Sequence, residues 1–125
     1  MSDENDNINS FIEEILETSI SGARVWVKAY RSGVPASMWA SFLDRPITAE
    51  AVERIAEGIS IQISRQVRQM PRDAGSEKLA EGHRFLREIY QKAREHNIDV
   101  DVKKIDWIML PGLERVREVL ARGDF

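Results

Sequence analysis

Apolar residues that recur once per helical turn are the feature that most restricts how this chain of 125 residues can fold. Three long stretches, residues 8–31, 48–70 and 76–96, carry such a stripe, and each stripe predicts a helix with one buried face. In the first stretch the stripe consists of Ile8, Phe11, Ile12, Ile15, Ser19, Ala23, Trp26, Val27 and Tyr30. We therefore expect an all-α protein.

Local signals indicate where these helices begin and end. Gly33 follows the first stretch and suits the left-handed position after a helix, as does Asn97 after the third. Thr48 and Ser76 are expected as N-caps, because their hydroxyls can accept from a free backbone N–H. The bases near the end of the first stretch complement the helix dipole. These bases are Arg24, Lys28 and Arg31.

The remaining residues predict shorter elements. Residues 37–43 resemble a short helix, and residues 98–102 an extended linker whose Asp101 caps another short helix. A last short helix is expected to begin at Leu113 and to end at Gly123. Short connections between long amphipathic helices favour antiparallel neighbours. We predict a compact bundle of five or six helices that forms a single domain over residues 8–125. Residues 1–7 are expected to be a flexible acidic N-terminus.

Composition excludes several classes of site. The chain has no cysteine, which rules out disulfides, thiolate zinc sites, iron–sulfur clusters and thiol nucleophiles. Its first residues, MSDENDN, do not resemble a signal peptide, and no apolar run is long enough to cross a membrane. A cytoplasmic protein is the simplest expectation.

No catalytic or metal-binding motif is found. His83 and His96 are too far apart for a pair on one helical turn, and no HExxH or Glu-x-x-His unit occurs. Asp99, Asp101 and Asp106 lack the spacing of a calcium loop. Glycine-rich phosphate loops are absent as well. The sequence therefore predicts no catalytic residue, metal, cofactor or small-molecule substrate.

Charge is distributed unevenly along the chain. Residues 1–22 carry six acids and no base, whereas residues 23–97 carry thirteen bases against nine acids. Within residues 65–94, arginines recur at intervals of three and four, which places them along helix sides. They form a candidate face for an anionic partner, although a solvated face with internal ion pairs is the simpler interpretation. The candidate residues are Arg65, Arg68, Arg72, Arg84 and Arg87.

The three tryptophans have different expected roles. Trp26 and Trp39 lie among other apolar residues and are expected in the core. A core position is also the simpler interpretation of Trp107. The alternative makes it a candidate apolar anchor for a protein partner, because tryptophan is enriched at binding hot spots. Further apolar residues fall off the main stripes and suggest a second contact surface. These are Val25, Ile61 and Phe85.

Two functions remain open from these patterns. The favoured one is a small interaction or regulatory module that binds a protein partner or itself as a homodimer, without catalysis. The alternative is a regulator that binds nucleic acid through the arginines of residues 65–94. Only the alternative predicts binding that weakens steeply with salt.

Overall fold

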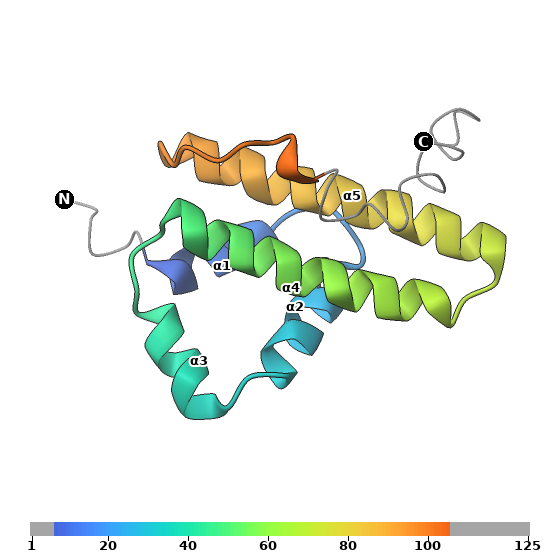
Figure 1. Ribbon diagram of the computed structural model, residues 1–125, viewed down its shortest axis with the longest axis horizontal. Helices are drawn as coiled ribbons and strands as arrows, with labels where there is room; N and C mark the ends of the chain where they lie inside the picture. Colours follow the sequence, from blue (N-terminus) through green and yellow to red (C-terminus); the bar gives the residue numbers. More distant parts are fainter. Residues whose placement is uncertain (1–6, 106–125) are drawn as a thin grey trace.

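The computed structural model describes residues 7–105, which form five α-helices and no strand (Figure 1). The predicted all-α bundle is confirmed. The helices are α1 (Ile8–Leu16), α2 (Ala23–Ser32), α3 (Ala36–Leu43), α4 (Ala49–Arg68) and α5 (Arg72–Glu95). No helix in residues 7–105 combines the length and the hydropathy that a membrane crossing requires.

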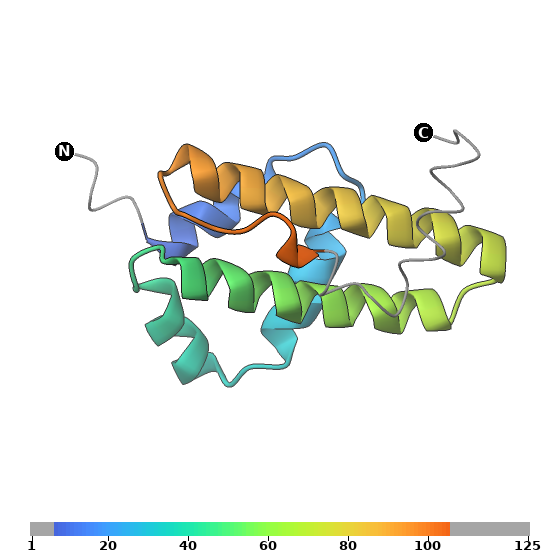
Figure 2. The same cartoon turned by 45° about the horizontal axis from the view of Figure 1, so that its top comes forward.

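An antiparallel hairpin of α4 and α5 forms the centre of the molecule (Figures 1 and 2). The Thr48 hydroxyl caps α4 as predicted, accepting from the Ala51 N–H at 3.1 Å. The stripe of α4 is buried, and Ile63 on it lies against Gly82 of α5. A Cβ on Gly82 would lie 2.7 Å from Ile63 Cδ1 and 2.8 Å from its Cγ2. The missing side chain therefore lets the two helices approach closely.

Helix α5 begins four residues earlier than the sequence predicts. Its N-cap is Pro71, and the first intrahelical bond runs from the Gly75 N–H to the Pro71 carbonyl at 2.8 Å. Asp73 then occupies the first turn, where an acidic side chain is favourable. The expectation that Ser76 caps this helix was wrong, because Ser76 is buried inside it.

The first predicted helix, residues 8–31, is divided into two. Helix α1 ends at Leu16 and α2 starts at Ala23, with Gly22 as its N-cap. The connection contains Thr18, Ser19, Ile20, Ser21 and Gly22, whose helix propensities are low. Contacts with α5 hold the chain in this non-helical conformation.

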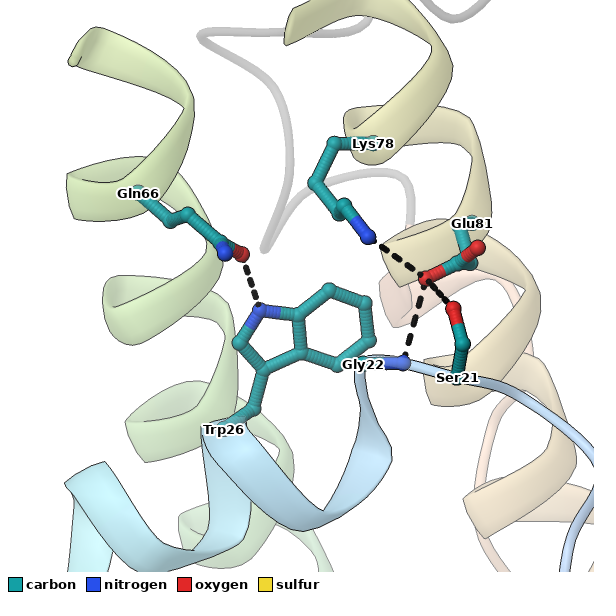
Figure 3. Close-up of polar contacts among 6 residues, drawn as sticks. All are labelled: Ser21, Gly22, Trp26, Gln66, Lys78 and Glu81. Atoms are coloured by element: carbon teal, nitrogen blue, oxygen red, sulfur yellow. Dashed lines mark hydrogen bonds and ion pairs between the residues drawn. The ribbon is translucent and has the colours of Figure 1, made fainter. Parts of the chain in front are cut away.

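Figure 3 shows how Glu81 of α5 holds the connection. Its Oε1 accepts from the Ser21 hydroxyl at 3.0 Å and from the Gly22 N–H at 3.2 Å. The same oxygen pairs with Lys78 Nζ at 3.2 Å. In a continuous helix the Gly22 N–H would instead donate to a backbone carbonyl, and the Ser21 hydroxyl would find a partner in the helix or in water. The carboxylate thus stabilises the bend between α1 and α2.

Trp26 joins α2 to both helices of the hairpin. Its indole Nε1 donates to Gln66 Oε1 of α4 at 2.8 Å (Figure 3), and its ring lies 5.8 Å from that of Phe85 of α5. Trp26 and Trp39 are buried, as predicted. Phe85 is also buried, so the suggestion that it belongs to a second surface was wrong.

The segment after α5 returns along the hairpin. Asn97 has a φ of 63°, the left-handed conformation predicted for it. The same prediction for Gly33 was wrong, since its φ is −83°. Residues 98–105 then run across the hairpin on the face opposite α2 (Figure 2). Val100 and Ile105 are buried there, and Lys104 Nζ pairs with Glu53 Oε2 at 3.0 Å. Hydrophobic side chains therefore cover the hairpin from both sides.

The close contact between the two hairpin helices leads to a first prediction. Gly82→Ala is expected to lower the free energy of unfolding by about 1–2 kcal/mol, since overpacking outweighs the better helix propensity of alanine. In an Ile63→Ala background, which removes the atoms that a Cβ would meet, the same change is expected to be neutral or stabilising. Urea unfolding followed by circular dichroism measures all four proteins. Equal effects of Gly82→Ala in both backgrounds would contradict the close contact.

A second prediction concerns Tyr90, whose hydroxyl is buried without a hydrogen-bond partner among the described residues. Burial, with the carboxylates of Glu53, Glu57 and Asp101, raises the pKa of Tyr90 to about 12. The folded state therefore holds this proton more tightly than the unfolded chain, in which tyrosine titrates near pH 10. The resulting stabilisation is complete below pH 10 and is lost as the pH rises towards 12, by about 2–3 kcal/mol.

Tyr90→Phe removes this titration and is expected to be neutral or slightly stabilising at pH 7, because the unpaired hydroxyl is lost. The difference in unfolding free energy between the variant and the wild type should then grow from pH 10 to 12. Denaturant titrations at several pH values measure it. A difference that stays constant over this range would show that the Tyr90 pKa is not raised.

Candidate binding groove

The five predicted arginines are all exposed, but they do not form one compact patch. Arg65 and Arg68 lie in the last turn of α4, and Arg72 is the first residue of α5 rather than part of α4. The turn between the helices brings these three to one end of the hairpin. Arg84 lies twelve residues further along α5 than Arg72, which is about 18 Å.

Arg84 and Arg87 are three residues apart on α5 and therefore share a side. Arg87 also lines a hollow of about 430 Å³ with Arg94, Glu95 and Val102. The carboxylate of Glu95 in this hollow offsets part of the positive charge. The predicted anionic-partner face thus divides into a cluster of three arginines at the hairpin end and a separate pair.

The apolar anchor candidates have mixed outcomes. Trp107 lies outside the described residues. Val25 and Ile61 are exposed, at 57% and 51% of their surface, as expected for off-stripe positions. Met38 on α3 is exposed to 63% and was not singled out from the sequence. The side chains of Val25, Met38 and Ile61 are absent from the walls of the hollow at Arg87 and of three further hollows within residues 7–105.

A depression lies where α1, α2 and α3 meet, and we name it the three-helix groove. It consists of two adjoining hollows of about 440 and 420 Å³. They share four lining residues, which are Lys28, Arg31, Trp39 and Leu43. The first hollow extends to α1, and the second extends along the α2–α3 connection to Val34. Figure 1 shows how α1, α2 and α3 are arranged beside the hairpin.

Apolar side chains form the inner surface of the three-helix groove. They are Ile12, Leu16, Val27, Val34, Trp39 and Leu43. Trp39 is buried against the protein, with ring centroids 5.6 Å from Tyr30 and 5.8 Å from Phe42. Tyr30 in turn lies on Gly58 of α4, where any Cβ would overlap its ring. The absence of a side chain at Gly58 thus lets the Tyr30 ring, with Trp39 against it, pack close to the backbone of α4.

Three cations of α2 form one rim of the groove. Arg24, Lys28 and Arg31 all line the first hollow, and all three are exposed. Their spacing of four and three residues places them along one side of α2. None of them forms an ion pair with another residue in the range 7–105. Glu13 of α1 is the acidic residue that lines the same hollow.

The sequence contained these three cations, but it did not indicate their surroundings. They were interpreted as partners of a helix dipole, because residues 8–31 were expected to form one straight helix. A straight helix cannot fold back to place Ile12 and Leu16 opposite Val27. The break at residues 17–22 creates the groove, and tertiary contacts with Glu81 determine that break.

Neither histidine lines the three-helix groove. His96 follows α5, and its Nε2 lies 2.6 Å from Glu14 Oε2 of α1. His83 is half-buried within α5. Across residues 7–105, no three His, Asp or Glu side chains gather in a way that could hold a metal ion. Asp106, the third of the acids considered from the sequence, lies outside this range.

The three-helix groove combines an apolar lining with a row of three cations along α2. Its polar groups can orient a ligand, while its apolar groups supply contact area. Comparisons of the chain with protein-family models, with curated proteins and with solved structures found no match.

Proposed function

We propose that this protein is a small interaction module that acts by binding a protein partner in the three-helix groove, without catalysing a reaction. The observation that carries the proposal is the continuous apolar depression over Trp39. Ile12, Val27 and Trp39 are buried in its floor, and Leu16, Val34 and Leu43 are half-buried in its walls. A concave site with apolar walls and a few polar groups is typical of binding sites. The two adjoining hollows also favour a segment of a macromolecule over a compact small molecule, because together they are lined by residues of α1, α2, α3 and the α2–α3 connection.

The cation row supports a protein partner. Arg24, Lys28 and Arg31 stand beside the apolar surface rather than on a separate face. Interfaces commonly combine an apolar centre with a polar rim, and arginine is enriched among their energetically important residues. A partner protein can supply both complementary parts at once.

Groove variants test the proposal. The variant Lys28→Glu/Arg31→Glu reverses two exposed charges, and Leu43→Ala removes part of the wall. Affinity capture from cells of the source organism should recover at least one protein with the wild type that both variants lose. Binding to the purified protein should weaken at least about tenfold with each variant, because a central contact and its rim are altered.

Matched controls lie outside the groove. Arg65→Glu/Arg68→Glu reverses two exposed charges at the hairpin end, and Met38→Ala removes an exposed apolar side chain from α3. Both controls should retain binding, and circular dichroism should show all four variants folded. If the controls lose the partner as readily as the groove variants do, the proposed location is wrong.

Binding of nucleic acid is the second candidate function, favoured by the meeting of Arg65, Arg68 and Arg72 at one end of the hairpin. If these three contact phosphates, log K should fall with log salt with a slope of about −2.7, since each contact contributes about −0.9. Electrophoretic mobility shifts with duplex DNA and RNA between 50 and 200 mM salt measure the slope. No shift at 50 mM salt, or an equal shift with Arg65→Glu/Arg68→Glu, would exclude this candidate.

A further inference from the structure

We infer that the partner segment is an amphipathic α-helix with acidic residues along one side of its apolar stripe. The inference rests on the proposed function, since it specifies what the three-helix groove binds. Three observations carry it: the walls of the groove, the extent of its lining along α2 and the position of its cations.

The walls indicate that the bound segment is helical. All three walls are helices, whose backbone groups are largely bonded within each helix. No strand edge lies beside the groove within the described residues. An extended peptide would therefore bury backbone N–H and C=O groups without backbone partners, which is costly. A helix satisfies these groups internally and presents only side chains to the groove.

The dimensions of the groove indicate the length of that helix. The ten residues of α2 extend for about 15 Å, and the two hollows follow α2 and the connection after it. A partner helix lying along this trough would use about ten residues, or three turns. Its apolar side chains would recur at positions i, i+3, i+4 and i+7, the spacing that keeps them on one face.

The charges indicate the composition of the side that faces α2. Arg24, Lys28 and Arg31 are exposed and form no ion pairs with other described residues, so a partner does not have to displace existing pairs. Only Glu13, on the α1 side, opposes them within the first hollow. Acidic residues on the α2 side of the partner would be attracted, and basic ones repelled. The cations therefore select the partner's charge and orient it in the groove.

A peptide selection tests the inference directly. A library of random 16-residue peptides is displayed and selected for binding to the full-length protein, with counter-selection against Lys28→Glu/Arg31→Glu. Enriched peptides are expected to combine the apolar spacing with Asp or Glu beside it, and to gain helical circular dichroism on binding. A selected peptide should bind the wild type and Arg65→Glu/Arg68→Glu equally, and bind Lys28→Glu/Arg31→Glu at least about tenfold more weakly.

A charge swap separates complementarity from loss of structure. When the acidic residues of a selected peptide are replaced by Lys, binding to the wild type should weaken, and binding to Lys28→Glu/Arg31→Glu should recover. Recovery requires a folded variant, so it also excludes unfolding as the cause of the weaker binding.

Two results would overturn the inference while the proposed function stands. Groove-dependent peptides that are neutral, basic or extended would show that the groove binds a partner of different chemistry. Sedimentation equilibrium that finds a dimer of the wild type but a monomer of Leu43→Ala would assign the groove to a second copy of the chain. If no peptide depends on the groove and affinity capture also finds no groove-dependent protein, the proposed function itself is wrong.

Discussion

The close packing of α4 against α5 is the interaction on which the rest of the structure depends. Gly82 allows Ile63 to approach the backbone of α5, and the hairpin that results offers two broad faces. One face receives α2 through Trp26, and the other receives the segment with Val100 and Ile105. The shorter helices bury their apolar residues on this hairpin and on each other. The geometry of the hairpin therefore determines where each short helix lies.

The groove is a consequence of how α3 is attached to this frame. Helix α3 has eight residues, follows Pro35 and is followed by Pro46, so it cannot extend in either direction without a change in backbone path. It buries Trp39 and leaves Met38 in solvent. A helix this short covers only part of the apolar surface of α1 and α2. The three-helix groove lies beside α3, where Leu16 of α1 and Leu43 of α3 stay half-buried.

The sequence predicted the elements whose apolar stripes are long and regular, and it failed where distant contacts decide the structure. The stripe from Val52 to Val67 and the cap at Thr48 are visible locally, and α4 was therefore predicted closely. The start of α5 was misplaced because serine is a preferred N-cap residue, which made Ser76 the expected start. The helix in fact begins directly after Pro71. The candidate arginines were correctly expected on the surface, but the groove escaped notice because it requires the bend before Ala23. Periodicity cannot reveal that bend.

The contact of Glu81 with Ser21 and Gly22 joins residues about sixty positions apart in the chain. Bringing such distant residues together costs loop-closure entropy, which local helix formation does not. Within residues 8–31 the apolar periodicity favours one continuous helix, and the low helix propensities of residues 18–22 oppose it only weakly without the contacts to α5. The corner between α1 and α2 thus depends on a residue of α5, far along the chain. The trough beside this corner therefore forms as a product of tertiary assembly rather than of local helix formation.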